Sequence, residues 1–186
     1  ISNIEKAEKD DNIKGILLNL NSFEAGYATT TEIRNALVKF KKSGKFLFAY
    51  AEYYSTKAYY LASAADKIYV HPEGAVDFKG LYAQLMFMKG ALDKLEIEPE
   101  IIRHGKFKSA IEPFILDKMS PENKEQVATF INSIWETISS EIAESRKISR
   151  EALEQISDSL SAENAKDALR LKLVDQLCYK DELEKI

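Results

Sequence analysis

The chain has 186 residues, of which 45% are hydrophobic and 30% are charged, a composition typical of one globular domain with a sizeable core. Its 26 basic and 30 acidic residues leave a net charge of −4, which argues against a nucleic-acid partner, since nucleic-acid-binding surfaces usually carry a basic excess. No apolar run approaches the roughly 20 residues of a membrane-spanning helix. The sequence opens at Ile1 rather than Met, so we expect an excised fragment whose membrane anchor lies upstream.

Helix and strand patterns alternate along the first 103 residues. In chain order we predict the end of a helix at 1–10, a strand at 15–20, a loop at 21–28, a helix at 29–41, a strand at 45–50, a loop at 51–54, a helix at 55–65, a strand at 67–70, an extended piece at 75–79, a helix around 88–95 and a strand at 98–103. The first strand is a short continuous apolar run, as in strands buried on both faces. This alternation indicates an α/β fold with a largely parallel sheet.

Particular residues set some of these boundaries. Thr29 and Glu32 offer a capping box for the helix that follows, with Ile33, Leu37 and Phe40 at core spacing. The turn His71-Pro72 is expected to end the third strand.

Beyond Met119 the chain is predicted to be helical. Ser120 provides an N-cap and Pro121 the first helical position. An apolar stripe follows at 127, 130, 131, 134, 135, 138 and 142, and we interpret it, Trp135 included, as a face that packs on the domain core or on a neighbouring subunit. The remaining predictions are helices at 150–157 and 162–172 capped by Ser149 and Ser161, a short strand at 173–174 and a helix from 180. No repeat or linker interrupts residues 1–186, so a single domain is expected.

The stretch Gly105-Lys-Phe-Lys-Ser-Ala-Ile-Glu-Pro-Phe carries a chemical signal. Lys108 follows a predicted strand, where α/β proteins tend to place their chemistry, and its neighbours at 107, 110, 111 and 114 are apolar. Desolvation lowers the pKa of a lysine, and a neutral lysine can accept a proton from a hydroxyl. The alternative is that Lys106, Lys108 and Lys118 are ordinary solvated lysines.

This stretch, with Asp117-Lys-Met-Ser-Pro, resembles the lysine region of the signal peptide peptidase A (protease IV) family, and in particular the amino-terminal half of its long, two-domain form. The resemblance continues through residues 59–70 and 71–77 to Lys172-Leu-Val-Asp, which is nearly the whole chain. It implies the crotonase/ClpP-like superfold, with flanking helices and a helical C-terminal part. It also implies a Ser-Lys dyad without histidine or aspartate, in which Lys108 is the catalytic general base.

By the same resemblance, the nucleophile of single-domain relatives falls on Thr56. Their Ala-Ser-Gly-Gly-Tyr pattern aligns with Ser55-Thr-Lys-Ala-Tyr, so Lys57 and Ala58 replace glycines that let the backbone approach substrate closely, and the Lys57 side chain should obstruct that approach. Their oxyanion loop aligns with residues 21–26, which have lost the paired glycines and gained an acidic residue that would oppose a developing oxyanion.

This loss fits the two-domain form, in which a downstream domain supplies the serine. Thr56 or Ser55 as a nucleophile activated by a neighbouring amine remains an alternative. Ser109 and Glu112 are close to Lys108 in sequence and are candidates for positioning it. Because an ion pair would favour the charged lysine, we assign Glu112 no catalytic role and interpret it as an exposed carboxylate at a helix end.

No cofactor or metal is expected. The two histidines, His71 and His104, lie in no ligand motif. Cys178 is the only cysteine, which excludes an internal disulfide and a cysteine-based zinc site.

The resemblance implies a serine peptidase, a hydrolase that degrades cleaved signal peptides and other apolar peptides, and that is inactive as this isolated fragment. It further implies a homo-oligomer, a tetramer, on the outer (periplasmic) face of the cytoplasmic membrane, attached only through an upstream anchor. A non-catalytic oligomerisation or scaffold domain of the same family is the alternative. A crotonase-type acyl-CoA enzyme is a third hypothesis that rests on fold alone.

Overall fold

The computed structural model describes residues 1–100, 109–183 and 185. These residues fall into two compact units, one made of Ile1–Gly80 with Thr137–Ile186 and the other of Leu81–Glu136. The long helix α6 (Pro121–Arg146) begins in the second unit and ends in the first. The expectation of one family domain over residues 1–186 stays a prediction.

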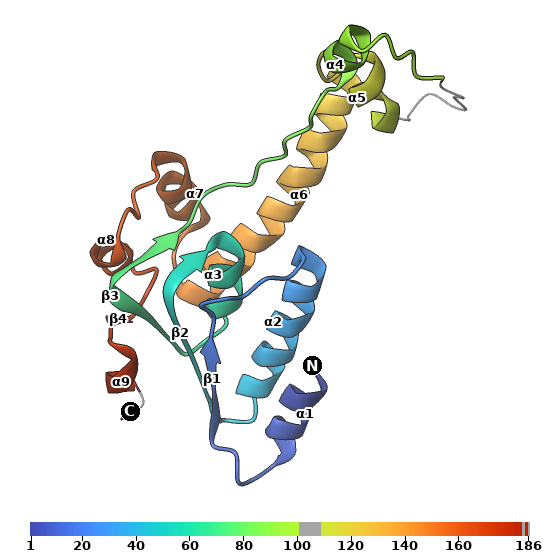
Figure 1. Cartoon of the computed structure of the whole chain (residues 1–186). Helices are drawn as coiled ribbons and strands as arrows, with labels where there is room; N and C mark the ends of the chain where they lie inside the picture. Colours follow the sequence, from blue (N-terminus) through green and yellow to red (C-terminus); the bar gives the residue numbers. More distant parts are fainter. Residues whose placement is uncertain (101–108, 184, 186) are drawn as a thin grey trace. The chain divides into compact units, whose positions relative to one another are not determined.

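The first unit is built on a parallel sheet (Figure 1). Among the described residues its strands are β1 (Gly15–Asn19), β2 (Phe46–Ser55), β3 (Lys67–Asp77) and β4 (Gln176–Leu177), which lie side by side in that order. Every neighbouring pair is parallel, and parallel strands need a crossover connection, usually a helix. The predicted α/β class with a mostly parallel sheet is therefore confirmed.

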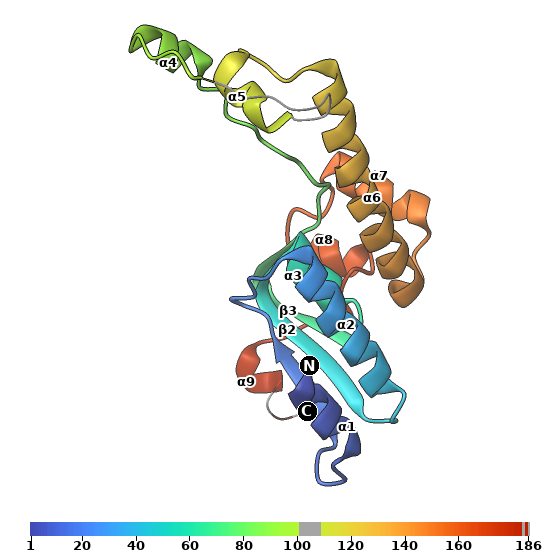
Figure 2. The same ribbon diagram turned by 90° about the vertical axis from the view of Figure 1, so that its right-hand side faces the viewer.

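Helices flank both faces of this sheet. They are α1 (Ser2–Lys9), α2 (Tyr27–Lys41), α3 (Thr56–Ala62), α7 (Arg150–Ser159), α8 (Ala165–Arg170) and α9 (Lys180–Leu183). Figure 2 shows α2 and α9 on opposite sides of the strands. Leu37 and Phe40 of α2 are fully buried, as their spacing predicts, together with Leu47 and Ile68 of the sheet. Burying one such side chain stabilises the fold by about 1.5–3 kcal/mol.

The second unit contains short helices beside the first part of α6. They are α4 (Lys89–Lys94), the 3₁₀ turn η1 (Ser109–Ile111) and α5 (Glu112–Ile115). Ser120 caps α6, because its hydroxyl accepts a hydrogen bond from the amide of Asn123 (3.1 Å). This cap confirms the prediction from Ser120-Pro121.

Two strands are longer than predicted. The expected loop at 51–54 is wrong, because β2 continues to Ser55, and β3 continues through His71-Pro72 to Asp77. The register between β2 and β3 shifts between Ala51 and Tyr53. Such an irregularity tolerates a proline that has no amide to donate. Gly74 is required there, since a Cβ atom at this position would lie 2.0 Å from the carbonyl oxygen of Glu52.

Some predicted caps and ends are also wrong. Helix α2 begins at Tyr27 behind Gly26, and no capping box forms at Thr29. Helix α8 is capped by Asn164 and not by Ser161. The side chain of Asn164 accepts hydrogen bonds from two backbone amides. The last strand lies at 176–177 rather than 173–174, since only those residues pair with β3. Residues 98–100 form no strand, and the rest of the strand predicted at 98–103 lies outside the described residues.

The apolar stripe of α6 is buried unevenly. Ile138 and Ile142, which belong to the first unit, are 2% and 0% exposed, whereas Phe130 in the second unit is 66% exposed. The interpretation of the stripe as a core-packing face is therefore confirmed for its C-terminal end only.

Candidate functional site

The junction between β2 and α3 carries Ser55 and Thr56, where the resemblance seen in the sequence predicts the position of a nucleophile. Ser55 is the N-cap of α3, and its hydroxyl accepts a hydrogen bond from the amide of Ala58 (3.3 Å). A serine at this position satisfies one of the free amides of the first helical turn. Ser55 therefore has a local structural role at this junction.

The hydroxyl of Thr56 is bonded to the backbone at the end of β3. Its Oγ1 atom lies 2.9 Å from the carbonyl oxygen of Asp77 and 3.2 Å from that of Lys79, so its single hydrogen is shared between two acceptors. The Lys79 amide lies 3.5 Å from the same oxygen. Thr56 is only 9% exposed. This hydroxyl joins α3 to the end of the neighbouring strand and is poorly placed to attack a substrate.

Lys57 reaches from α3 to the preceding loop. Its Nζ atom donates a hydrogen bond to the carbonyl oxygen of Ala25 (2.9 Å) and lies 5.6 Å from the ring centroid of Tyr27. An ammonium over an aromatic face gains a further attraction of about 0.5–1 kcal/mol at an exposed site. The side chain thus occupies the place where the resemblance predicts a glycine.

A pocket of about 710 Å³ lies at this junction. It is lined by residues 20–26 of the loop and by Tyr53, Ser55, Lys57 and Ala58. The loop is fastened to β2, because the side-chain oxygen of Asn21 accepts from the amide of Glu52 (2.6 Å). The pocket lining includes the ammonium of Lys57 and the carboxylate of Glu24. It includes no Gly-Gly pair that would present backbone amides to an oxyanion.

Tyr53, Asp77 and Lys79 form a polar cluster beside this pocket. Asp77 accepts from the hydroxyl of Tyr53 (2.7 Å) and pairs with the ammonium of Lys79 (2.8 Å). Desolvation of the hydroxyl, together with its hydrogen bond to Asp77, raises the pKa of Tyr53 to about 12, although the residue as a whole is 51% exposed. Burial would raise the pKa of Asp77, but the hydrogen bonds from Lys79 and Tyr53 outweigh it and lower that pKa. The cluster therefore holds a carboxylate and a neutral phenol at neutral pH.

Lys108, the predicted general base, lies outside the residues that the structure describes, as do Gly105, Lys106 and His104. The description resumes at Ser109, the first residue of η1, which runs directly into α5. The site prediction for Lys108 therefore stays a prediction. What the structure gives is the geometry of the segment that follows it.

Glu112, four residues after Lys108, is engaged at the start of α6. Its carboxylate accepts from the hydroxyl of Ser120 (2.6 Å), the amide of Ser120 (3.1 Å) and the side-chain amide of Asn123 (2.9 Å). The interpretation of Glu112 as an exposed carboxylate is wrong, because the residue is half-buried. Negative charge is favoured at a helix N-terminus, where backbone amides are free.

Sequence reasoning missed this contact for a physical reason. The Ser-Pro pair marks the start of α6, but the carboxylate that reaches it comes from another helix, eight residues upstream. A capping box, in contrast, places its carboxylate three residues inside the same helix. No short-range pattern predicts a cap that arrives from outside the helix.

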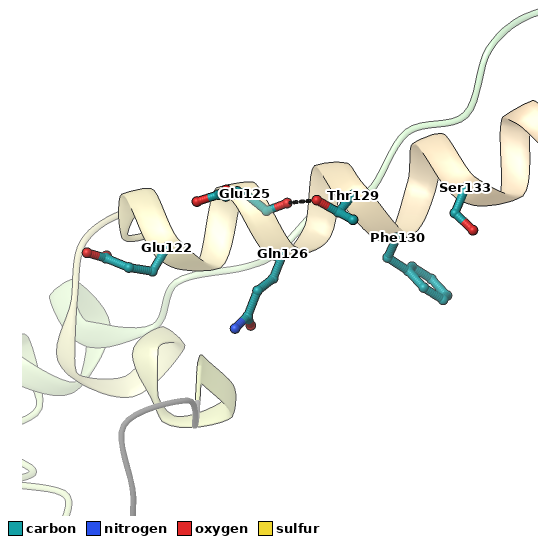
Figure 3. A pocket seen from close by; sticks show the side chains of 6 residues that line it. All are labelled: Glu122, Glu125, Gln126, Thr129, Phe130 and Ser133. Carbon is teal, nitrogen blue, oxygen red and sulfur yellow. Dashed lines mark hydrogen bonds between the residues drawn. The ribbon is translucent and has the colours of Figure 1, made fainter.

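A second pocket, of about 570 Å³, runs along one face of α6 (Figure 3). It is lined by Glu122, Glu125, Gln126, Thr129, Phe130 and Ser133, which recur at helical spacing. In Figure 3 the ring of Phe130 points away from the helix axis, on the same side as Gln126. The pocket contains carboxylates and hydroxyls but no histidine or cysteine, and it gathers no evident catalytic group.

The described ranges contain no metal-binding cluster and no helix suited to span a membrane. No group of three histidine, cysteine or carboxylate side chains there could hold a metal ion. His71 accepts a hydrogen bond from the amide of Glu73 (3.1 Å) and packs edge-on against Tyr179. Among the same residues, no helix combines the length and apolarity that crossing a bilayer requires.

Comparison with known proteins identifies close relatives. Residues 39–185 match the family described as peptidase family S49. Protease 4 of Salmonella typhi is 39% identical over 193 aligned positions, which cover the whole of this chain and 31% of the relative. Protease 4 of Haemophilus influenzae is 40% identical over 81% of this chain and 25% of the relative. The chloroplastic serine protease SPPA of Arabidopsis thaliana is 34% identical over 72% of this chain and 20% of the relative. The chain thus spans a third or less of the length of these three relatives.

Proposed function

We propose, from the premise that this chain belongs to peptidase family S49, that it supplies the general base of a serine peptidase. The fold of that family is crotonase/ClpP-like, and the four-stranded parallel sheet with flanking helices agrees with it. The predicted superfold and the predicted family are thereby confirmed. Because the chain covers only part of its relatives, the activity of the whole protein is inferred rather than read from this chain.

The base in this proposal is Lys108. Neutral Lys108 takes the proton from a serine hydroxyl of a second domain, the serine oxygen attacks a peptide carbonyl, and a tetrahedral intermediate collapses to an acyl-enzyme. Protonated Lys108 then gives its proton to the leaving amine. In the second half of the reaction, neutral Lys108 activates the water that hydrolyses the acyl-enzyme. Proton count and charge balance, because every proton that Lys108 takes up is passed on.

One observation carries the division of labour between two domains. The hydroxyl of Thr56 is buried and bonded to the carbonyl oxygens of Asp77 and Lys79, so the position that aligns with the nucleophile has no reactive hydroxyl exposed to substrate. Lys57, which stands in place of a glycine, extends to Ala25. The nucleophile and its oxyanion hole are therefore proposed to come from elsewhere in the full-length protein.

The remaining parts of the proposal rest on resemblance to the signal peptide peptidase A family. The proposed substrates are cleaved signal peptides and other apolar peptides. The full-length protein is proposed to be a homotetramer that an upstream anchor holds on the outer face of the cytoplasmic membrane. The names of the relatives, two proteases 4 and a serine protease SPPA, support the peptidase class. No cofactor enters this mechanism.

The test is hydrolysis of an apolar fluorogenic peptide by the full-length protein and its Lys108→Ala variant. Lys118→Ala is the matched control, since Lys118 is an exposed lysine on the same segment. We expect Lys108→Ala to abolish turnover while circular dichroism stays unchanged, and Lys118→Ala to retain parental turnover.

The alternative, a non-catalytic scaffold domain, is favoured by the same bonded hydroxyl of Thr56. It predicts that Lys108→Ala leaves turnover unchanged in a folded protein. That result would refute the assignment of the base.

A further inference from the structure

We propose that the pocket lined by residues 20–26 and by the junction of β2 with α3 binds the free C-terminal carboxylate of an apolar peptide, with Lys57 as its cation. Hydrolysis of a peptide bond creates such a carboxylate, so the source of the ligand rests on the proposed function. The recognition itself rests on residues of the first unit alone. It involves neither Lys108 nor bond cleavage, and the pocket is therefore a product-binding site rather than a part of the active site.

The ammonium of Lys57 has hydrogen-bond donors to spare. A lysine ammonium carries three N–H donors and no acceptor. Lys57 donates to the carbonyl oxygen of Ala25 (2.9 Å), and no other acceptor for it lies among the residues that the structure describes. The residue lines the pocket and is half-buried. Two N–H donors on a charged group thus remain for an acceptor in a bound ligand.

Two uncharged side chains add donors from the two walls of the pocket. The hydroxyl of Ser55 accepts from the amide of Ala58 (3.3 Å), and its own hydrogen has no acceptor in the described part of the chain. The side-chain oxygen of Asn21 accepts from the amide of Glu52 (2.6 Å), which leaves its NH₂ group as a donor. Ser55 and Asn21 both line the pocket. An ionised carboxylate has two oxygens that accept several hydrogen bonds, so it matches a set made of one cation and two neutral donors.

The charges of the lining favour an anion with a single negative charge. Among the described residues that line the pocket, Lys57 is the one basic side chain and Glu24 the one acidic side chain. Glu24 is exposed, so water and salt screen its repulsion of an anion bound at the ammonium. A dianion such as phosphate would keep one unpaired charge beside Glu24. A carboxylate needs only one cation, and charge-assisted hydrogen bonds are roughly twice as strong as neutral ones.

Apolar side chains next to these donors select a peptide over a small carboxylate. Leu20 and Ala58 are 5% and 2% exposed, Phe23 is half-buried, and all three line the pocket together with Tyr53. Ligand sites typically combine such apolar walls with a few polar groups that fix orientation, in volumes of about 300–1,000 Å³. The volume of this pocket is about 710 Å³. Its walls therefore suit the last side chains of an apolar peptide, whereas acetate would leave them without a contact.

Hydrogen bonds hold both ends of the lining loop in place. The amide of Leu20 donates to the carbonyl oxygen of Tyr50 (2.9 Å), which fastens the start of the loop to β2. The ammonium of Lys57 fastens the end of the loop, at Ala25, to α3. Binding therefore does not have to order a loop, which lowers its entropic cost.

The experiment measures the affinity of the full-length protein for a fluorescein-labelled Leu-Leu-Ala peptide by fluorescence anisotropy. The peptide is compared as its free acid and as its C-terminal amide, and its peptide bonds are N-methylated so that binding is measured apart from hydrolysis. We expect the free acid to bind on the order of 10-fold more tightly than the amide, since only the acid brings a charge to pair with the ammonium.

Two substitutions at Lys57 separate its charge from its place in the pocket wall. Lys57→Met keeps the apolar stem and removes the cation, so the acid and the amide should bind equally. Lys57→Arg keeps a cation with donors for a carboxylate and should keep the preference for the acid. Ser55→Ala, which removes one neutral donor, should weaken binding of the acid on the order of 3-fold. Lys67→Met is the matched control and should keep the parental preference, because Lys67 is an exposed lysine of β3 outside the pocket lining.

Competition and crosslinking identify the ligand and its place. Unlabelled acetate and inorganic phosphate should displace the labelled acid only at concentrations far above that of the unlabelled peptide acid. A water-soluble carbodiimide joins a carboxylate to an amine in contact with it. It should attach the peptide to Lys57 and not to Lys67, as located by mass spectrometry.

The proposal is overturned if the parental protein binds the acid and the amide equally, or if Lys57→Met keeps the preference for the acid. It is also overturned if Lys57→Arg binds the acid as weakly as Lys57→Met, since the wall rather than the charge would then matter. Displacement by acetate at the concentration of the peptide would refute a peptide ligand, and displacement by phosphate at that concentration would refute a singly charged one.

Failure of the proposed function is a separate result. In that case Lys108→Ala stays active while the preference for the acid persists. Failure of this inference alone leaves Lys108→Ala inactive and the preference for the acid absent.

Discussion

The ammonium group of Lys57 donates a hydrogen bond to the carbonyl oxygen of Ala25 over 2.9 Å. This contact joins the first turn of α3 to the loop that precedes α2, and the ring of Tyr27 lies beneath the same ammonium. The resemblance seen in the sequence predicts a glycine at this place in the family's pattern. In this chain the place holds Lys57, which connects two walls of a pocket.

Loss of this tether should cost stability but not activity. We expect Lys57→Ala to lower the free energy of unfolding by about 0.5–1.5 kcal/mol, the net worth of an ordinary hydrogen bond, and to leave peptide turnover by the full-length protein unchanged. Lys57→Met is the matched control, since it keeps the apolar stem and removes only the donor. Urea unfolding and peptide hydrolysis measure the two effects. A large fall in turnover with an intact fold would show that Lys57 acts in catalysis.

Thr56→Val tests whether the bonded hydroxyl is a nucleophile. Valine has nearly the shape of threonine but leaves the carbonyl oxygens of Asp77 and Lys79 without this partner, so we expect a loss of about 1–3 kcal/mol in unfolding free energy. Turnover should persist in the folded fraction. Thr56→Ser keeps the hydroxyl and serves as the control. Complete loss of turnover in folded Thr56→Val, with activity kept by Thr56→Ser, would assign the nucleophile to this chain.

Arg34 should be costly to replace, because it is buried and engaged in a polar network. It is 4% exposed, and its guanidinium donates to the carboxylate of Glu141 (2.7 Å) and to the hydroxyl of Ser145 (2.6 Å). Tyr60 donates to the same carboxylate (2.7 Å) and lies under the guanidinium. The network ties α2 and α3 to the C-terminal part of α6 within the first unit.

We expect Arg34→Ala to lower the free energy of unfolding by on the order of 3 kcal/mol, because it leaves a partly buried carboxylate without its cation. Arg34→Lys should recover little, since an ammonium cannot reproduce the forked geometry. Lys39→Ala is the control. The Lys39 side chain is 61% exposed and pairs with Glu8 at 3.5 Å, so its loss should cost less than about 1 kcal/mol. Equal effects of the Arg34 and Lys39 variants in denaturant unfolding would contradict the network.

Tyr53 provides a pH-dependent prediction. Its pKa is raised to about 12 by desolvation of its hydroxyl and by the hydrogen bond to Asp77, whereas a tyrosine in an unfolded chain titrates near 10. The folded state therefore holds this proton more tightly. The resulting stabilisation is fully present below about pH 10 and is lost as pH rises from about 10 towards 12.

Carbon-13 NMR of the ring carbon bonded to oxygen in labelled tyrosine, assigned with Tyr53→Phe, measures this titration. A midpoint near 10 would contradict the raised pKa of Tyr53. Tyr53→Phe should also raise the pKa of Asp77, because it removes one of the donors that lower it.

The parallel sheet was predictable because its strands are encoded locally. The run Gly15-Ile-Leu-Leu and the predicted strands at 45–50 and 67–70 are short apolar or aromatic segments separated by helical patterns, and β1, β2 and β3 begin at or within one residue of them. Their ends were not predictable. The extension of β2 through Tyr53 and Tyr54 depends on pairing with Ala75 and Val76 of β3, and a local pattern contains no information on a partner some 20 residues away.

The candidate site, too, was predictable from the sequence only in part. The missing Gly-Gly pair at Lys57 and Ala58, and the lysine motif around Lys108, are visible in the sequence, as is the family to which they point. Where the side chain of Lys57 goes, and what holds the hydroxyl of Thr56, required the neighbouring loop and strand to be placed. The two residues of each of these contacts lie more than 20 positions apart in the sequence. Composition and periodicity therefore cannot predict that they meet.

By itself, then, the sequence determined the α/β class, the family and the position of the lysine motif, because these follow from periodicity and from a local order of residue types. Only the tertiary structure decided that Arg34 meets Glu141 across 107 residues and that Glu112 caps α6 from another helix. Removing such a polar side chain from water costs free energy unless complementary donors or acceptors surround it in the fold. That complementarity is a property of the folded arrangement and not of any segment of the chain.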